Sequence, residues 1–202
     1  MNSSYFTEFF INVIQNGGYF AITILMIFDS FNFPIPSEIV IPFGSYLASI
    51  NYLNIYLVVL CSVIGSVVGS LLSYFLAEFI LEARKKLKIL KKLLPEKSIN
   101  KTHFWFEKYG SFSVFWGRMV PGVRTFISLP AGIAKMSLPK FISYTFLGSI
   151  IWSSFLAYLG FNLKNSWEII YFYLKKLEIV FITIILALIF IFIIKNLFRK
   201  RV

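Results

Sequence analysis

The chain has 202 residues and a net charge of +11, and 58% of its residues are hydrophobic. That share exceeds the roughly 45–50% of a soluble domain, while charged residues, at 14%, are unusually few. A sequence this apolar and this poor in charge is not intrinsically disordered. Its single cysteine excludes a disulfide scaffold and a thiolate zinc cluster, and we expect neither a metal nor a cofactor.

Four apolar stretches are long enough to cross a bilayer, since about 20 helical residues span its hydrocarbon core. They cover residues 9–28, 55–80, 141–161 and 177–194. The sequence therefore predicts an all-α polytopic membrane protein, with about four transmembrane helices in a single membrane domain, 1–202. We expect membrane lipids, and not nucleic acid, to be the partners of this positively charged chain.

Two further apolar segments, residues 29–49 and 117–136, are interrupted by proline and glycine. Proline removes a backbone hydrogen-bond donor and breaks a continuous helix. Backbone groups freed in this way must be buried in protein or line a wet cavity, because lipid cannot satisfy them. We therefore predict a re-entrant helical hairpin in each segment, which enters and leaves the membrane on the same side.

The distribution of Lys and Arg predicts the topology. Residues 81–103 form a basic loop, and the last helix and tail, 171–202, end in further cations. Positive loops stay in the cytoplasm, which predicts a cytoplasmic location for this loop and, by counting crossings, for both termini. The remaining chain then divides into two repeats of opposite orientation, 9–80 and 104–162.

Inverted repeats built on broken helices are typical of transporters, whose binding site lies near the membrane midplane. In both predicted repeats a hairpin precedes a helix with a Gly-Ser step, Gly65-Ser66 in the first and Gly148-Ser149 in the second. Small residues also recur in membrane helices because they allow close packing. Packing alone is therefore a second explanation of the similarity.

Four ionisable residues fall within the two hairpin segments, namely Asp29, Glu38, Arg118 and Arg124. A charge at the bilayer centre costs roughly 2.5–3.5 kcal/mol on insertion scales, so such residues are rare and mostly functional. Pairing between the carboxylates and the guanidiniums would reduce that cost. The pattern indicates either a substrate site or an ion-pair lock between the repeats, and Asp29 also fits a place at the outer interface.

Two arginines six residues apart suit a phosphate ligand, because the planar guanidinium can bind two phosphate oxygens at once. A half-helix after Pro121 would add backbone donors at its N-terminus. We predict a site for a phosphate-bearing lipid headgroup. Its residues are Arg118, Arg124, Glu38, Thr125 and Gly122.

Carboxylates repel a phosphate, so the predicted site needs a way to neutralise them. Protonation of Glu38 would release an arginine to the headgroup and would couple transport to a proton gradient. Asp29 is the second acid that we assign to this coupling.

Residues 114–125 (VFWGRMVPGVRT), followed by Pro130-Ala131-Gly132, resemble the arginine motif of the DedA family. That family belongs to a superfamily of VTT-domain, or SNARE-associated, membrane proteins. The acidic segment 29–38 (DSFNFPIPSE) is similar to the family's first hairpin, and the resemblance covers residues 10–165. One departure concerns the next helix, where many members carry an Asp after a glycine and this chain has Gly65-Ser66 and Gly69-Ser70.

The resemblance implies a bacterial inner-membrane protein that moves a lipid phosphate, undecaprenyl phosphate in several members, between leaflets. It assigns roles to Glu38, Arg118 and Arg124, and a homo-oligomer is compatible with it. The alternatives are a phospholipid scramblase, a proton-driven exporter of small molecules and an intramembrane lipid phosphatase. We expect a carrier and not an enzyme, because the chain lacks HExxH and GxSxG motifs.

Overall fold

The computed structural model describes residues 5–33, 35–120 and 122–162, and these residues form α-helices and no strand. The helices are α1 (Tyr5–Ser30), α2 (Ser37–Ser49), α3 (Ile55–Lys86), α4 (Lys88–Leu93), α5 (Glu96–Tyr109), α6 (Phe112–Arg118), α7 (Val123–Phe126), α8 (Ser128–Ile133) and α9 (Leu138–Asn162).

Three segments are long and apolar enough to cross a membrane, namely Phe9–Ser30 within α1, and the whole of α3 and α9. They confirm the all-α class and the three predicted spans in this part of the chain. The fourth predicted span, 177–194, lies outside the described residues, as does the rest of the predicted C-terminal segment 171–202.

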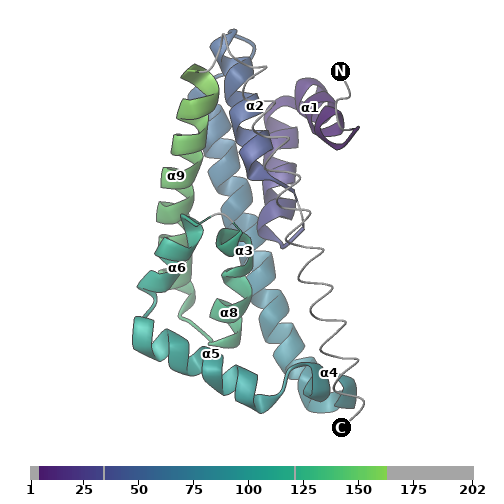
Figure 1. The fold of residues 1–202 in the computed structure, drawn as a ribbon, viewed down its shortest axis with the longest axis vertical. Helices are drawn as coiled ribbons and strands as arrows, with labels where there is room; N and C mark the ends of the chain where they lie inside the picture. The colour runs from purple at the N-terminus through teal and green to yellow at the C-terminus, as the bar shows by residue number, and fades with distance from the viewer. Residues whose placement is uncertain (1–4, 34, 121, 163–202) are drawn as a thin grey trace.

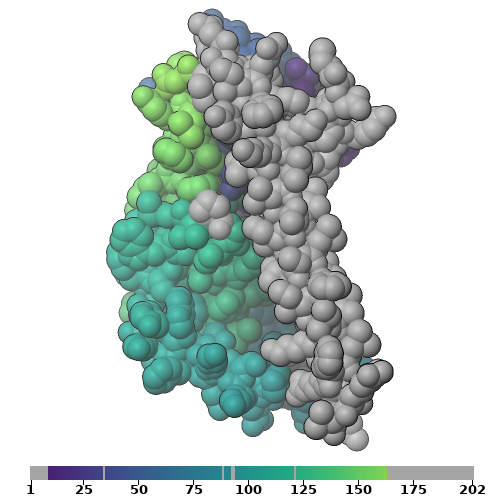
Figure 2. Space-filling view, in the orientation of Figure 1, coloured from purple at the N-terminus to yellow at the C-terminus, as the bar shows by residue number. Residues whose placement is uncertain are grey.

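The long helix α3 runs the length of the bundle (Figure 1). Its 32 residues make it about 48 Å long, since a helix rises 1.5 Å per residue. Helices α1 and α2 pack beside its first half and α8 beside its second, and α9 contacts both α2 and α3. The amphipathic helix α5 lies across the end where α3 finishes, below α6 and α9 (Figures 1 and 2).

Most positively charged residues of the described part of the chain gather at that end of the bundle. We call it the basic end, and it carries α4, α5 and the start of α9. All the lysines and arginines of the described residues lie there or close to it, except Arg118 and Arg124. The loop of residues 50–54 marks the opposite end and carries no charge.

The helix α1 bends at Gly18, whose φ of 51° and ψ of −132° suit glycine and strain other residues. Its first half lies at the opposite end (Figure 1), where the Tyr52 hydroxyl donates to the Gln15 carbonyl over 3.2 Å and the Asn54 N–H donates to the Tyr19 hydroxyl over 2.6 Å. The described start of α1 therefore does not lie on the side of the basic loop, where we expected the N-terminal region.

The chain reverses direction within both predicted hairpin segments. In the first segment, α1 continues to Ser30 and the turn lies between α1 and α2. The end of α1 is therefore one limb of this hairpin, and α2 is the other. In the second, α6 ends at Arg118, and the return is broken into the short helices α7 and α8. The re-entrant course of these segments and the inverted repeat stay predictions.

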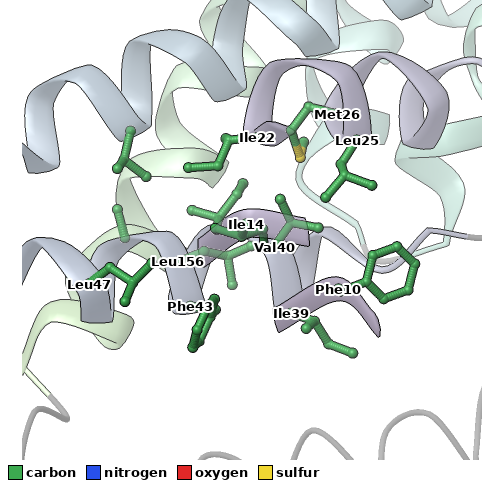
Figure 3. Packing of buried hydrophobic residues seen from close by; sticks show 13 residues of the cluster. Phe10, Ile14, Ile22, Leu25, Met26, Ile39, Val40, Phe43, Leu47 and Leu156 are labelled. Carbon is green, nitrogen blue, oxygen red and sulfur yellow. The ribbon is translucent and has the colours of Figure 1, made fainter. Parts of the chain in front are cut away.

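Buried hydrophobic side chains form two separate clusters. The first joins α1, α2, α3 and α9, and includes Ile14, Met26, Val40, Phe43 and Leu156 (Figure 3). The second lies toward the basic end and includes Tyr74, Val114, Ala131, Met136 and Phe141. The space between these two clusters holds the candidate site.

Candidate functional site

Small polar side chains separate the two apolar clusters. Val58 of α3 belongs to the first cluster and Tyr74 to the second, and the buried serines between them are Ser62, Ser66, Ser70 and Ser73. In the same way, Thr145, Ser149 and Ser153 of α9 lie between Phe141 and Leu156. We call these seven hydroxyl residues, together with the charged groups beside them, the polar layer.

Arg124 of α7 and Asp29 of α1 form a buried ion pair in this layer, with 6% of each side chain exposed. The Arg124 Nη2 donates to Asp29 Oδ2. The guanidinium also lies over the ring of Trp152 in α9, 5.8 Å from its centroid, in a cation–π contact. Asp29 is thus an internal counter-ion of Arg124.

Arg118, the last residue of α6, is 3% exposed and has different surroundings. Its Nη2 donates to the hydroxyls of Ser70 on α3 and Ser128 on α8, the latter over 2.8 Å. Its Nε has no partner, and no carboxylate of the described residues pairs with it. Arg118 is therefore a buried cation that hydroxyls hydrogen-bond, while the charged groups within its electrostatic range, Arg124 and Asp29, are paired with each other.

Glu38 lies in the first turn of α2 and is half-buried. It accepts a hydrogen bond from the Ser37 hydroxyl over 3.2 Å and lies within electrostatic range of Asp29. Among the described residues it forms no ion pair with Arg118 or Arg124. Of the inter-segment pairs that we expected, the structure forms only the one made by Asp29, because the last turn of α1 contacts α7 directly.

Thr125 and Gly122 lie close to Arg124 in the chain but differ from it in surroundings. Thr125 is half-buried within α7, and Gly122 precedes α7 with a φ of 78°. The half-helix predicted after Pro121 corresponds to the apolar helical segment Val123–Ile133, in which α7 and α8 join at Ile127, and its Arg124 N–H already donates to the Val120 carbonyl over 3.1 Å. It provides fewer free backbone donors than we expected.

Sequence reasoning missed the neutral partners of the arginines. Ser70, Ser128 and Trp152 contact a guanidinium, and Gly148 lets α9 approach Arg118 so closely that a Cβ there would lie 2.6 Å from the Arg118 Cβ. The available signal was the departure from the DedA pattern in α3, where many members carry an acid after a glycine and this chain has Gly65-Ser66 and Gly69-Ser70. Of these two serines, Ser70 accepts a hydrogen bond from Arg118.

A family model described as the VTT domain matches residues 35–162, which include α2, both arginines and the polar layer. The chain belongs to the VTT-domain family. This finding confirms the resemblance to DedA and VTT proteins. The matched residues include every described helix except α1.

Curated relatives support the same membership. The chain is 37% identical over 201 residues to an "Alkaline phosphatase-like protein" of Lactococcus lactis, covering 96% of this chain and 92% of the relative. It is 33% identical to "Undecaprenyl phosphate transporter A" of Bacillus subtilis, covering 77% and 76%. It is 32% identical to the protein of that name in Staphylococcus aureus, covering 91% of each. No solved structure matches the chain significantly.

Proposed function

We propose that this VTT-domain membrane protein carries a lipid phosphate between the leaflets of the bilayer, with the headgroup passing through the polar layer. The observation that carries this proposal is the buried guanidinium of Arg118, with which no carboxylate of the described residues forms an ion pair. Its electrostatic attraction to Asp29 is opposed by repulsion from Arg124, the ion-pair partner of that carboxylate. An unpaired charge in a membrane interior is costly and marks a substrate path. An anionic headgroup would supply the missing counter-charge.

The surroundings of the arginines favour a lipid over a soluble anion. The residues that flank Arg118 and Arg124 in the chain are apolar and exposed, namely Trp116, Val120, Val123 and Phe126. In a membrane these side chains face lipid, so each buried guanidinium lies about one layer of side chains from the acyl chains. A lipid headgroup could therefore reach Arg118 from the side while its tail stays in the bilayer.

Undecaprenyl phosphate is our leading substrate, because two bacterial relatives with more than three quarters of their length aligned are named transporters of it. We place the protein in the bacterial cytoplasmic membrane with its basic end in the cytoplasm, as the positive-inside rule requires. Glu38 is the group for proton coupling, since it is half-buried beside the Arg124–Asp29 pair without being committed to an arginine. A phospholipid scramblase or a proton-driven exporter would use the same charges.

A lipid phosphatase is the second candidate, because two Lactococcus relatives are named alkaline phosphatase-like. Ser70 would be the nucleophile nearest to Arg118, but its hydroxyl already donates to the Ser66 carbonyl and accepts from Arg118. The chain's single histidine, His103, lies in α5 at the basic end, beside Phe106 and Glu107, and cannot act as its base. We therefore favour transport over hydrolysis.

The test is a leaflet-accessibility assay in proteoliposomes with a labelled short polyprenyl phosphate. The wild type should move the lipid, and Arg118→Gln should reduce the rate at least about tenfold by removing the charge that binds the headgroup. Arg84→Gln is the matched control, because Arg84 lies at the basic end and pairs with Glu96. A wild-type rate for Arg118→Gln would refute the proposal, and release of inorganic phosphate would establish the phosphatase instead.

A further inference from the structure

The surroundings of Arg118 contain several hydrogen-bonding groups without a partner. In the described part of the chain, buried side-chain atoms with no partner include Arg118 Nε, Ser66 Oγ and Thr145 Oγ1. Buried polar groups are normally satisfied, so each exception calls for an explanation. All three of these groups can donate a hydrogen bond.

The packing of α3 against α9 places these groups at one level of the bundle. The two helices run in opposite directions, and the rings of Tyr74 and Phe141 meet with their centroids 5.0 Å apart. One turn away from this contact lie Ser70 on α3 and Thr145 on α9. Ser70 contacts Arg118, so Thr145 lies level with that guanidinium.

A second contact supports this placement. Arg118 packs on Gly148, which lies three residues after Thr145 and therefore on the same face of α9. Ser66 lies one turn from Ser70 on the buried face of α3. Two unpartnered hydroxyls, one from α3 and one from α9, therefore lie in the same part of the polar layer as the unpartnered Nε of Arg118.

A ligand for this group must be an anion rich in hydrogen-bond acceptors. The guanidinium supplies a permanent positive charge and the two hydroxyls supply neutral donors, a set that suits the oxygens of a phosphate. A neutral lipid would leave Arg118 without a counter-charge, and an amine would be repelled. The Arg124–Asp29 pair, by contrast, is already neutral and satisfied by its own contacts.

We propose that Arg118 binds the phosphate monoester itself, that Thr145 and Ser66 donate hydrogen bonds to its oxygens, and that the Arg124–Asp29 pair holds the site together without contacting the anion. The inference rests on the proposed function and deepens it, because it divides two arginines of one motif between different roles. Thr145 and Ser66 become specificity-determining residues for phosphate.

The experiment measures binding of farnesyl phosphate to the purified full-length protein in nanodiscs by calorimetry. Thr145→Val keeps the volume of the side chain and removes the hydroxyl, and we expect it to weaken binding at least about tenfold, as for a lost bond to a charged group. Thr145→Ser should restore binding to near the wild-type value. Ser143→Ala, which removes an exposed hydroxyl of α9 that lies outside the polar layer and donates to the Pro139 carbonyl, should change the affinity less than about twofold.

Two further ligands distinguish the source of the phosphate. Farnesol should not bind, because it lacks the anion, and inorganic phosphate should compete only weakly if the prenyl chain contributes to affinity. Equal binding of inorganic phosphate would assign the site to a free anion and overturn the lipid part of the proposal. Thermal melting of each variant identifies loss of fold, and Ser66→Ala, which removes the other proposed hydroxyl, keeps the test decisive if Thr145→Val unfolds.

The outcomes separate this inference from the proposed function. Wild-type affinity of both Thr145→Val and Ser66→Ala would overturn the phosphate-binding role of these hydroxyls, even if the vesicle assay shows transport. Weakened binding by Thr145→Val, together with a wild-type protein that moves no lipid in vesicles, would uphold the site and refute the carrier.

Discussion

The two buried arginines show how the same side chain takes different roles according to its neighbours. Arg124 has a carboxylate and an aromatic face, so its charge is balanced inside the protein. Arg118 has two hydroxyls, which solvate the guanidinium but do not neutralise it. In a buried ion pair, the attraction between the two charges offsets part of the free energy lost on desolvation. A buried ion without a counter-ion keeps the full desolvation penalty. The difference predicts opposite responses to mutation.

Loss of one partner of the Arg124–Asp29 pair should destabilise the protein. We expect Asp29→Asn to lower the free energy of unfolding by about 3–5 kcal/mol, because Arg124 is left buried without its counter-ion. The double variant Asp29→Asn, Arg124→Gln should recover part of that loss, because it removes both charges. Thermal unfolding in detergent measures both effects.

The control is Arg118→Gln, which removes a cation that lacks a carboxylate partner. It should cost less stability than Asp29→Asn, or should stabilise the protein, while it abolishes lipid movement. If Asp29→Asn unfolded at the wild-type temperature, the ion pair would have no structural role.

The charged residues of the site could be predicted from the sequence, but their partners could not. Arg118 and Arg124 stand out because a charge within an apolar segment has few explanations. Of the two acids the sequence favoured Glu38 for the site, because Asp29 also fitted the outer interface. The pairing depends on which helix end reaches α7, a property of three-dimensional packing. Thr145 gave no signal, because hydroxyl residues in membrane helices usually serve close packing.

At the scale of elements, glycines set the distance between helices. Gly160 of α9 lies against α2, where an added Cβ would come within 2.3 Å of the Pro42 carbonyl oxygen. Gly65 and Gly69 of α3 lie as close to the backbone of α1. Small residues at such crossings let membrane helices pack by van der Waals contact. These crossings hold α2, α3 and α9 close together around the polar layer.

Gly160→Ala should destabilise the protein more than Gly44→Ala. At Gly160 the new methyl would meet backbone atoms of Pro42, which cannot move without shifting α2, and we expect a cost of about 1–3 kcal/mol. At Gly44 it would meet the Ile22 Cδ1 at 2.8 Å, the end of a flexible side chain. Unfolding of the two variants under the same conditions gives the comparison, and an equal or larger loss for Gly44→Ala would contradict the assigned crossing.

The same helices show how far elements could be predicted. The spans of α3 and α9 follow from apolar length alone, and the structure confirms them. The bend of α1 could not be located, because a Gly-Gly pair in an apolar helix is compatible with a straight span. The second hairpin segment was expected to contain a half-helix, and the segment Val123–Ile133 has that helical course, although its division into α7 and α8 at Ile127 could not be predicted.

At the scale of the whole molecule, charge asymmetry defines an orientation. The cations of the described residues gather at the basic end, and the 50–54 loop at the opposite end carries none. The polar layer lies between them, with an apolar cluster on each side. This order of layers matches a bilayer in which the arginines lie at depth and the basic end faces the cytoplasm.

Single cysteines at the two ends test that orientation. In a Cys61→Ala background, Tyr52→Cys lies in the loop of the opposite end and Ser98→Cys lies in α5 at the basic end, and both positions are exposed. A membrane-impermeant maleimide should label Tyr52→Cys in intact cells and Ser98→Cys only after permeabilisation. Asn12→Cys, in the first half of α1, should behave like Tyr52→Cys, because that half lies at the opposite end. Labelling of Ser98→Cys in intact cells would contradict a cytoplasmic location of the basic end. Labelling of Asn12→Cys only after permeabilisation would support the cytoplasmic N-terminal region that counting of crossings predicts.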